Sequence, residues 1–316
     1  MNGAVIIDKP EGKTSHDIVS KVKKILGVRK AGHTGTLDPM ATGVLTVCLD
    51  EATKLTKFLA GEDKEYLATM LLGVKTDTLD SKGKVIATSD KFVSEKEIRA
   101  VITQMKGKIK QIPPAYSAIK YHGEPLYKWA RRGIFLDKEP REVKINSIIV
   151  ENISFPRVTF RVDCSKGTYI RTLCSDIGER LGCGACLCGL RRLRSGIFSE
   201  EMAVSLSDQE NYTYKDKKNE LLEKILPMAK LMPLMIAIEV EDNFAAKLRH
   251  GTQPSVEMMK EYVLPFLAVG DMIKFINREG DLVALAEMVA PVNKFPEFDS
   301  KDQAAKIVRV FNKIYN

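Results

Sequence analysis

The sequence predicts an α+β fold, in which helices flank a mixed sheet, followed by a small β-rich domain. Stretches with apolar residues at helical spacing alternate with short apolar runs that are typical of buried strands. The composition changes near residues 227–233, and mostly strand-like segments follow. The chain of 316 residues is 44% hydrophobic and 28% charged, which suffices for a sizeable core. We therefore expect one domain over residues 1–233 and a β-barrel-like domain over 234–316.

Helices are predicted where apolar side chains fall on one face. Residues 15–26 have such a face, and Gly27 can end the helix. Ser94 and Glu97 have the spacing of a capping box, which marks the start of another helix. Further helices are expected at residues 51–60, 168–181 and 243–249.

Strands are predicted where short runs are rich in apolar residues. In the larger domain these runs cover residues 43–49, 65–72, 143–149 and 158–164. In the C-terminal part, residues 272–276 and 282–288 flank the segment Arg278–Asp281, which has the composition of a hairpin turn.

The charge balance favours a polyanionic partner. The net charge is +8 and the isoelectric point is about 9.0, which suits nucleic acid, although a solvated basic surface explains the same numbers. Residues 106–133 contain a single acidic residue, Glu124, and residues 124–132 alone fit a solvated amphipathic helix. The longer segment interleaves basic and aromatic residues, namely Lys106, Lys108, Lys110, Tyr116, Lys120, Tyr121, Tyr127, Lys128, Trp129, Arg131 and Arg132. We expect this segment, about residues 106–135, to contact RNA phosphates and unpaired bases.

No stretch of the sequence is long and apolar enough to predict a membrane span. The apolar run Ala4–Ile7 is followed at once by Asp8 and Lys9, which is not the pattern of a signal peptide. The chain has six cysteines, and without an export signal we expect reduced thiols and a cytoplasmic location.

The segment 32–45 has the composition of a tight loop that enters a strand. It reads Gly-His-Thr-Gly-Thr-Leu-Asp-Pro-Met-Ala-Thr-Gly-Val-Leu, and its glycines, threonines and proline exclude a regular helix. Pro39 restricts Asp38 to an extended conformation, with His33 five residues upstream. A carboxylate on a rigidly held loop is a candidate catalytic group. For an Asp-Pro pair taken alone, a turn in which the aspartate caps the backbone is the more common arrangement.

The whole segment resembles the catalytic loop of the TruB family of pseudouridine synthases, across essentially all fourteen positions. Further family motifs match in order between residue 8 and about residue 198, and the C-terminal part is similar, at a lower level, to an RNA-binding PUA domain. The matching segments are Asp8–Ser15, Lys64–Tyr66, Thr76–Asp80, Gln111–Lys120, Cys164–Arg171 and Leu190–Arg192.

This resemblance implies a role for each matching residue. Asp38 takes the place of the nucleophilic aspartate, Arg171 that of the arginine paired with it, and Tyr66 that of the tyrosine that stacks on the target base. Without the resemblance, Arg171 fits a surface ion pair and Tyr66 a core aromatic. The implied RNA and substrate contacts fall on His33, Asp80, Tyr116, Lys120 and Leu190, with Leu190 packing beneath the target base.

The implied reaction is the isomerisation of a uridine to pseudouridine at position 55, in the T-loop of tRNA. A carboxylate is a suitable nucleophile for either the ribose or the uracil ring, and Arg171 beside it would favour the ionised form. The target base must be flipped out of folded RNA at a cost of about a few kcal/mol and then held by stacking. Tyr66 would supply that surface, and its hydroxyl could relay the proton released at C5. Because the reaction is a redox-neutral rearrangement, we expect neither cofactor nor metal.

Two alternatives are weighed against this function. One is a guide-RNA-directed pseudouridine synthase, which has a closely related loop but acts in a multi-protein particle; Met40–Thr42 and Pro113–Tyr116 favour the stand-alone type. The other is a non-catalytic RNA-binding or tRNA-folding protein, against which the set of Asp38, Tyr66 and Arg171 argues. We therefore expect a monomer that binds the T-stem-loop of tRNA, with no obligatory protein partner.

The clustered cysteines raise the alternative of a metal site. Cys183, Cys186 and Cys188 lie close together, with Cys174 one helix away. A C-x-x-C-x-C spacing suits zinc, but no second such pair is present and no histidine lies between His122 and His250. We expect plain thiols.

Overall fold

The larger of two main sheets runs through the first two thirds of the chain. The computed structural model describes residues 1–136, 138–206 and 213–312, and within them this sheet has eleven strands. Two neighbouring pairs on its main path are parallel and the others antiparallel, so the sheet is mixed. The main path is β14 (Val204–Ser205), β1 (Gly3–Lys9), β3 (Thr42–Leu49), β12 (Ala185–Ser195), β4 (Lys64–Leu72), β11 (Arg157–Cys164), β10 (Arg141–Ser154) and β7 (Gly107–Gln111).

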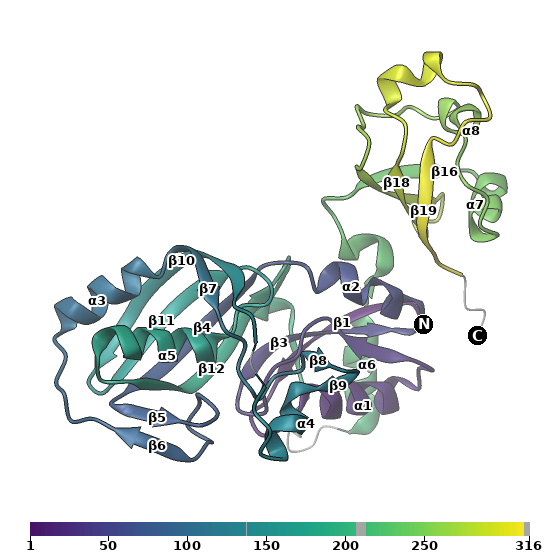
Figure 1. Cartoon of the computed structure of the whole chain (residues 1–316). Coiled ribbons are helices and arrows are strands. Elements are labelled where there is room, and N and C mark those ends of the chain that lie inside the picture. Colours follow the sequence, from purple (N-terminus) through teal and green to yellow (C-terminus); the bar gives the residue numbers. More distant parts are fainter. Residues whose placement is uncertain (137, 207–212, 313–316) are drawn as a thin grey trace.

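Helices α3 (Glu95–Gln104) and α5 (Ile170–Leu181) cover one half of this sheet (Figure 1). The capping box predicted at α3 is confirmed, because the Ser94 hydroxyl accepts from the Glu97 amide and the Glu97 carboxylate accepts from the Ser94 amide. The buried faces of both helices join a core that includes Ile98, Leu173, Ile177 and side chains of β4, β10, β11 and β12.

Helix α1 (Ser15–Leu26) packs on the other half of the sheet, where β1 and β3 lie. The predicted bounds and end are confirmed: Gly27 adopts a left-handed conformation with φ of 69°, which suits glycine, and its amide donates to the carbonyl of Lys23. Helix α6 (Tyr214–Glu223) lies beside α1, and the Tyr214 hydroxyl donates to the Lys24 carbonyl.

The helix predicted over residues 51–60 is wrong in type. A 3₁₀ helix, η1 (Asp50–Leu55), is followed by one short turn of α-helix, α2 (Thr56–Leu59). The hydroxyls of Thr53 and Thr56 donate to the carbonyls three residues before them, at 2.6 and 2.8 Å. These side-chain hydrogen bonds compete with the regular hydrogen-bond pattern of an α-helix. Threonine, as a β-branched residue, also has a low propensity for α-helix.

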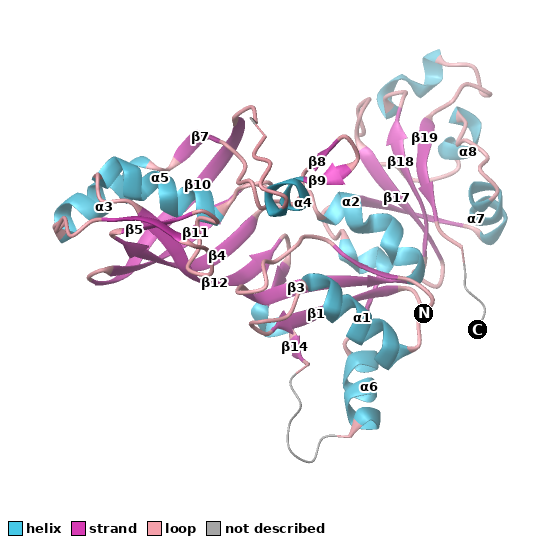
Figure 2. Ribbon diagram, turned by 60° about the horizontal axis from the view of Figure 1, so that its bottom comes forward, coloured by secondary structure: helices cyan, strands magenta, loops and turns pink. Residues whose placement is uncertain are grey.

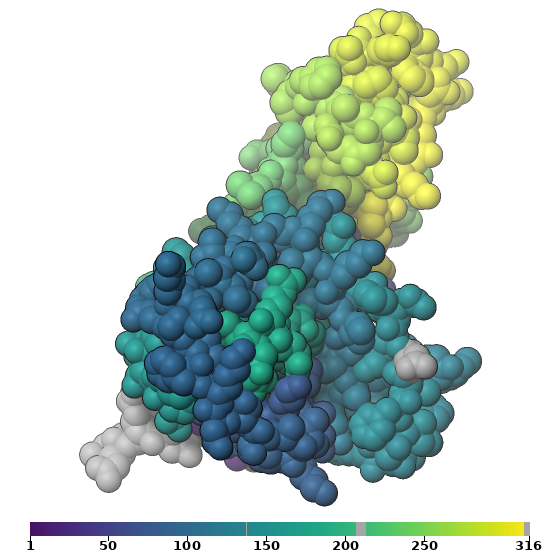
Figure 3. Space-filling model, turned by 60° about the vertical axis from the view of Figure 1, so that its left-hand side comes forward, coloured from purple at the N-terminus to yellow at the C-terminus, as the bar shows by residue number. Residues whose placement is uncertain are grey.

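The C-terminal part contains a four-stranded sheet in the order β16 (Ile236–Val240), β17 (Met272–Asn277), β18 (Leu282–Met288) and β19 (Ala305–Val310). The predicted hairpin between β17 and β18 is confirmed, since the Asn277 amide donates to the Asp281 carbonyl at 3.0 Å. Helices α7 (Asp242–Arg249) and α8 (Val256–Lys260) pack against this sheet. The C-terminal part, coloured green to yellow, rises from the rest of the molecule in Figure 3.

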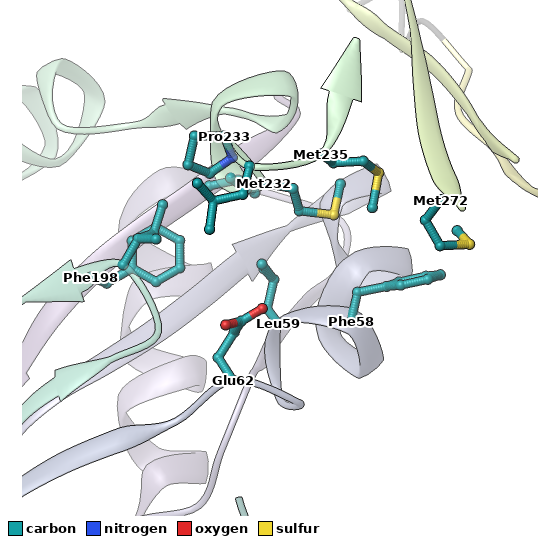
Figure 4. Close-up of a pocket in the computed structure, with 11 residues that line it drawn as sticks. Phe58, Leu59, Glu62, Phe198, Met232, Pro233, Met235 and Met272 are labelled. Carbon is teal, nitrogen blue, oxygen red and sulfur yellow. The ribbon is translucent and has the colours of Figure 1, made fainter. Parts of the chain in front are cut away.

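A hydrophobic cluster joins the two sheets. Leu285 and Phe311 of the C-terminal part pack with Leu55 and Met228, and the buried ammonium of Lys274 donates to the carbonyls of Ala229 and Met232. A cavity of about 360 Å³ lies at this junction. Figure 4 shows its lining, which includes Phe58, Leu59, Phe198, Met232, Met235 and Met272, with the carboxylate of Glu62 at one side.

The later part of the segment predicted to contact RNA, residues 120–131, forms a small unit near the middle of the molecule (Figure 2), whereas its first part contains β7 of the large sheet. The small unit contains the hairpin β8 (Lys120–Tyr121) and β9 (Glu124–Pro125), followed by α4 (Leu126–Arg131). The remaining elements are β2 (Ala31–His33), β5 (Val74–Thr76), β6 (Val85–Thr88), β13 (Phe198–Ser199), η2 (Glu200–Met202), β15 (Leu226–Pro227), η3 (Met228–Leu231) and η4 (Val292–Glu297). None of the helices in the described part of the chain has the length and apolar character needed to traverse a bilayer.

Candidate active site

Asp38, in the loop between β2 and β3, forms an ion pair with Arg171 of helix α5. The Nε atom of Arg171 lies 2.9 Å from Oδ2 of Asp38, and its Nη2 donates to Oδ1 at 3.4 Å. Asp38 does begin a turn, because the Ala41 amide donates to its carbonyl at 3.0 Å. Its carboxylate, however, faces the guanidinium, so the arrangement in which it merely caps the backbone does not describe this loop.

Arg171 connects four of the sequence motifs. Besides Asp38, its guanidinium donates to the carbonyl of Tyr116 at 2.8 Å and to the carbonyl of Thr78 at 3.1 Å, and its Nη1 lies 3.7 Å from Oδ2 of Asp80. The side chain is only 6% exposed, whereas that of Asp38 is 35% exposed. The guanidinium is thus fixed from several sides, and the carboxylate remains open to a substrate.

The pKa of the Asp38 carboxyl is raised above its ordinary value. Burial is the main cause, and the nearby Asp80 adds to it, whereas the positive charge of Arg171 is the largest opposing influence. Arg171 therefore favours the ionised form, as expected, but does not fully offset the desolvation of the carboxylate.

Tyr66 lies near the start of strand β4. Its backbone pairs with Val162 on one side and Arg192 on the other, and its partly buried ring packs against the core under α5. Burial raises the pKa of the phenol, the Arg192 charge opposes that shift, and the Asp38 charge adds to it. The hydroxyl of Tyr66 thus shares the electrostatic environment of Asp38.

His33 and Leu190 lie on strands next to the same loop. His33 is on β2, half-buried, and its Nδ1 has no hydrogen-bond partner among the described residues. Burial and the charge of Arg192 lower the pKa of the imidazole, so the neutral ring is favoured. Leu190 on β12 packs against the same core as Tyr66, and its carbonyl accepts from the Thr42 hydroxyl at 3.5 Å.

Tyr116 and Lys120 are placed differently from each other. Tyr116 reaches the site through its backbone carbonyl, which Arg171 holds. Lys120 is exposed on β8, and no contact to Asp38 or Arg171 is present in the described part of the chain. The expected contact of Lys120 with RNA stays a prediction.

Lys9 was missed by sequence reasoning, although it lies in one of the quoted motifs. Its fully buried ammonium donates to the carbonyls of Pro10, Lys13 and Pro39, at 2.9, 2.7 and 3.3 Å. Burial lowers the pKa of Lys9 to about 8, while the charge of Asp38 opposes the shift. This ammonium links the N-terminal motif to Pro39, the residue that follows Asp38. The only signal for Lys9 in the sequence is its position within a complete family motif.

The clustered cysteines are all free, and three of the four are buried. The thiols of Cys183 and Cys188 donate to the carbonyls of Gly184 and Thr69, each at 3.3 Å. Over residues 1–136, 138–206 and 213–312, no group of three metal-ligating side chains is close enough to hold an ion. The cavity at the junction of the two sheets contains none of the candidate site residues.

Comparison with known proteins assigns the chain to a family. Residues 23–170 match the model of the TruB family pseudouridylate synthase N-terminal domain, and residues 171–232 match that of the tRNA pseudouridylate synthase B C-terminal domain. A tRNA pseudouridine synthase B of Syntrophus aciditrophicus is 49% identical over 312 residues, which is 99% of each chain. The chain belongs to the TruB family of pseudouridylate synthases.

Further relatives and solved structures agree with membership of the TruB family. A tRNA pseudouridine synthase B of Geobacter sulfurreducens is 39% identical, over 99% of this chain and all of the relative. A chain in the crystal structure of a Cbf5-Nop10-Gar1 complex aligns over 98% of this chain and 84% of its own, with a TM-score of 0.74 and 32% identity. These findings confirm the predicted family, its enzyme class of isomerase, and the α+β fold with a small C-terminal sheet compatible with a PUA-type domain.

Proposed function

We propose that this TruB-family enzyme converts uridine 55 in the T-loop of tRNA to pseudouridine, with Asp38 as the nucleophile. The observation that carries the proposal is the pairing of Asp38 with Arg171. It sets a partly exposed carboxylate in a fixed orientation, and attack on a flipped nucleotide requires such an orientation. The relatives at 49% and 39% identity are named tRNA pseudouridine synthase B, which supports tRNA as the substrate.

The residues around Asp38 are proposed to hold the flipped base. Tyr66 offers an aromatic face and a hydroxyl, and Leu190 packs against the same core as Tyr66. The neutral ring of half-buried His33 suits the space that the base leaves in the RNA. Asp80 lies beside the Asp38–Arg171 pair, where it helps to hold the guanidinium. The reaction is a redox-neutral rearrangement, so the proposal includes neither cofactor nor metal.

The electrostatic part of tRNA binding is assigned to residues 1–233. From residue 234 onward, acidic residues slightly outnumber basic ones, so the net positive charge of the chain lies entirely before that point. Exposed lysines that can reach phosphates lie on two parts of the segment: Lys106, Lys108 and Lys110 at and just before β7, and Lys120 and Lys128 on β8 and α4. We propose that residues 234–316 form a PUA-like domain, which adds RNA contacts that depend less on positively charged side chains.

The enzyme is proposed to act in the cytoplasm as a monomer without an obligatory protein partner. The two relatives named tRNA pseudouridine synthase B align with the whole chain. The structural relative belongs to a Cbf5-Nop10-Gar1 complex. The second candidate is therefore an enzyme that acts within a multi-protein particle. The free cysteines suit a reducing compartment.

The test is to incubate the purified chain with unmodified tRNA and, separately, with an isolated T-stem-loop, and to map pseudouridine by position. One pseudouridine at position 55 in both RNAs is expected, and Asp38→Asn serves as the inactive control. Absence of product in both RNAs, or product only after guide RNA and partner proteins are added, would contradict the proposal.

A further inference from the structure

Arg192 lies between the strand that follows the Asp38 loop and the strand that carries Tyr66. It is on β12, and its backbone pairs with Gly43 of β3, at the end of the Asp38 loop, and with Tyr66 of β4. The side chain is 1% exposed, and it is among the largest fully buried side chains in the described structure. Gly43 has a φ of 97°, and any side chain there would collide with the Arg192 backbone. Strands β3 and β12 therefore approach each other closely at this point.

The guanidinium of Arg192 bridges the two ends of the Asp38 loop. Its Nε donates to the carbonyl of Val44 at 2.6 Å, and its Nη2 donates to the carbonyl of Gly35 at 3.1 Å. One of these carbonyls precedes Asp38 in the chain and the other follows it. Because a guanidinium is planar and rigid, the two bonds fix the distance between the ends of the loop.

The positive charge of Arg192 is not neutralised by a carboxylate. In the described part of the chain, Arg192 forms no ion pair within 4.0 Å. Its side chain donates to two backbone carbonyls and also forms a hydrogen bond with the hydroxyl of Tyr66. Two further buried cations, Lys9 and Lys64, are close enough to feel its charge. Burial of an unpaired charge is costly, and carbonyl groups compensate for only part of that cost.

We infer that Arg192 is a positioning residue of this enzyme, which fastens the loop around Asp38 and directs an unneutralised positive charge at the phenol of Tyr66. The inference rests on the proposed function, because it assigns to Arg192 a part in the same reaction. Arg192 acts through Asp38 and Tyr66 and does not itself touch the substrate.

The charge and the geometry have separable effects. Fixing the loop ends keeps the Asp38 carboxylate in line with its target, and a displacement of about 1 Å in such a group costs on the order of 100-fold in rate. The charge stabilises the ionised form of Tyr66 whenever its hydroxyl gives up a proton, which is consistent with the way Arg192 opposes the burial-raised pKa of that phenol. Lysine retains the charge but lacks the planar fork that spans both carbonyls.

The test compares Arg192→Lys and Arg192→Gln with the matched changes Arg194→Lys and Arg194→Gln. Arg194 is on the same strand, but its partners are the Gly196 carbonyl and the carboxylates of Asp163 and Glu65, and none of them belongs to the Asp38 loop. The measurements are the single-turnover rate at saturating T-stem-loop RNA, RNA affinity, thermal unfolding and the pH dependence of the rate. For both Arg192 variants we expect RNA affinity within about threefold and a rate lower by roughly 10- to 100-fold.

The pH dependence separates positioning from a general loss of structure. In Arg192→Gln the rate deficit should exceed that of Arg192→Lys, because the phenol of Tyr66 has become harder to ionise, and it should shrink only at alkaline pH, where the wild-type phenol itself begins to ionise. In Arg192→Lys the deficit should be independent of pH, because the charge remains. A loss confined to RNA affinity, wild-type rates in folded Arg192 variants, or pH-independent deficits of equal size in both would overturn the inference.

Two further controls keep the result interpretable. If Arg192→Gln does not fold, the rate of Arg192→Lys decides, and if neither folds, Gly35→Val does. A Cβ at Gly35 would already be in contact with Nη1 of Arg192, at 3.4 Å, so the two further methyl groups of valine would press on the bridge without removing the charge. A normal rate in that variant overturns the inference. Failure of the proposed function is distinguishable, because the wild-type enzyme would then form no pseudouridine at position 55.

Discussion

Arg171 holds Asp38 and Tyr116 with the same terminal nitrogen. Its Nη2 donates to Oδ1 of Asp38 at 3.4 Å and to the carbonyl of Tyr116 at 2.8 Å. Tyr116 belongs to the segment that is expected to contact RNA, so one buried guanidinium links that segment to the candidate nucleophile. A shift of the segment on RNA binding would therefore be felt directly at Asp38.

Removing the charge of Arg171 is expected to move the acid limb of the pH–rate profile to higher pH. Burial raises the pKa of Asp38, and Arg171 is the largest influence that lowers it. Without that charge the pKa rises further, so the carboxylate becomes protonated, and inactive, at a higher pH. Single-turnover rates of Arg171→Met and Arg171→Lys across acidic and neutral pH test this, and the lysine variant should shift less. An acid limb that stays in place in Arg171→Met would contradict the assignment.

Asp38→Asn should abolish turnover and leave RNA binding nearly intact. The change keeps the size of the side chain and removes the nucleophilic charge. Phosphate contacts dominate RNA affinity, so we expect a change in affinity within about tenfold, or roughly 1.4 kcal/mol. Pseudouridine formation and RNA binding are measured on the same preparation. Turnover near the wild-type rate would remove Asp38 from the reaction.

Two substitutions at Tyr66 separate proton transfer from stacking. Tyr66→Phe keeps the aromatic face and removes the hydroxyl, whereas Tyr66→Leu removes both. A general base contributes ~10²–10⁴-fold in rate, and base–aromatic stacking contributes roughly 1–3 kcal/mol. We expect the Phe variant to lose turnover with near-normal RNA affinity. A normal single-turnover rate in Tyr66→Phe would mean that stacking is the only role of Tyr66. A normal rate in Tyr66→Leu would mean that Tyr66 takes no part in the reaction.

Leu285→Ala should destabilise the junction between the two sheets. Leu285 is fully buried in the cluster that joins β18 to the N-terminal strands. Truncating such a side chain typically lowers the free energy of unfolding by about 2–5 kcal/mol. Leu234→Ala is the matched control, because Leu234 is 92% exposed and a change there should stay within about 0.5 kcal/mol. Urea unfolding measures both, and equal stabilities would show that the junction is not a packed core.

The thiol of Cys186 should be unreactive in the native enzyme, and the purified protein should contain no stoichiometric zinc. Burial raises the pKa of Cys186 to about 11, so the metal-binding thiolate is scarce at neutral pH. Elemental analysis and thiol labelling before and after unfolding test this. About one zinc per chain that is lost in Cys186→Ser would establish a metal site instead.

Most of the helices and strands that local sequence patterns predicted are confirmed. The bounds of α1, the capping box at Ser94 and the β17–β18 hairpin all depend on residues close together in the chain, and each is confirmed. Strand β12 was not predicted, because its run of glycine, cysteine and arginine has neither an alternating nor a continuous apolar pattern. It forms a strand because it lies between β3 and β4, which supply its hydrogen bonds on both sides.

The sequence by itself determined the family, the mixed α+β fold and the list of candidate site residues, since fourteen consecutive positions around Asp38 and six further motifs carry that information. Only the tertiary structure decided which of these residues meet. Asp38 and Arg171 are far apart in the chain and come into contact because α5 follows a strand of the same sheet. The structure also identified Lys9 and Arg192 as the cations that fasten the Asp38 loop. Their partners in the loop are backbone carbonyls, which every residue has, so no sequence pattern can mark them; the fold alone determines which carbonyls lie within reach.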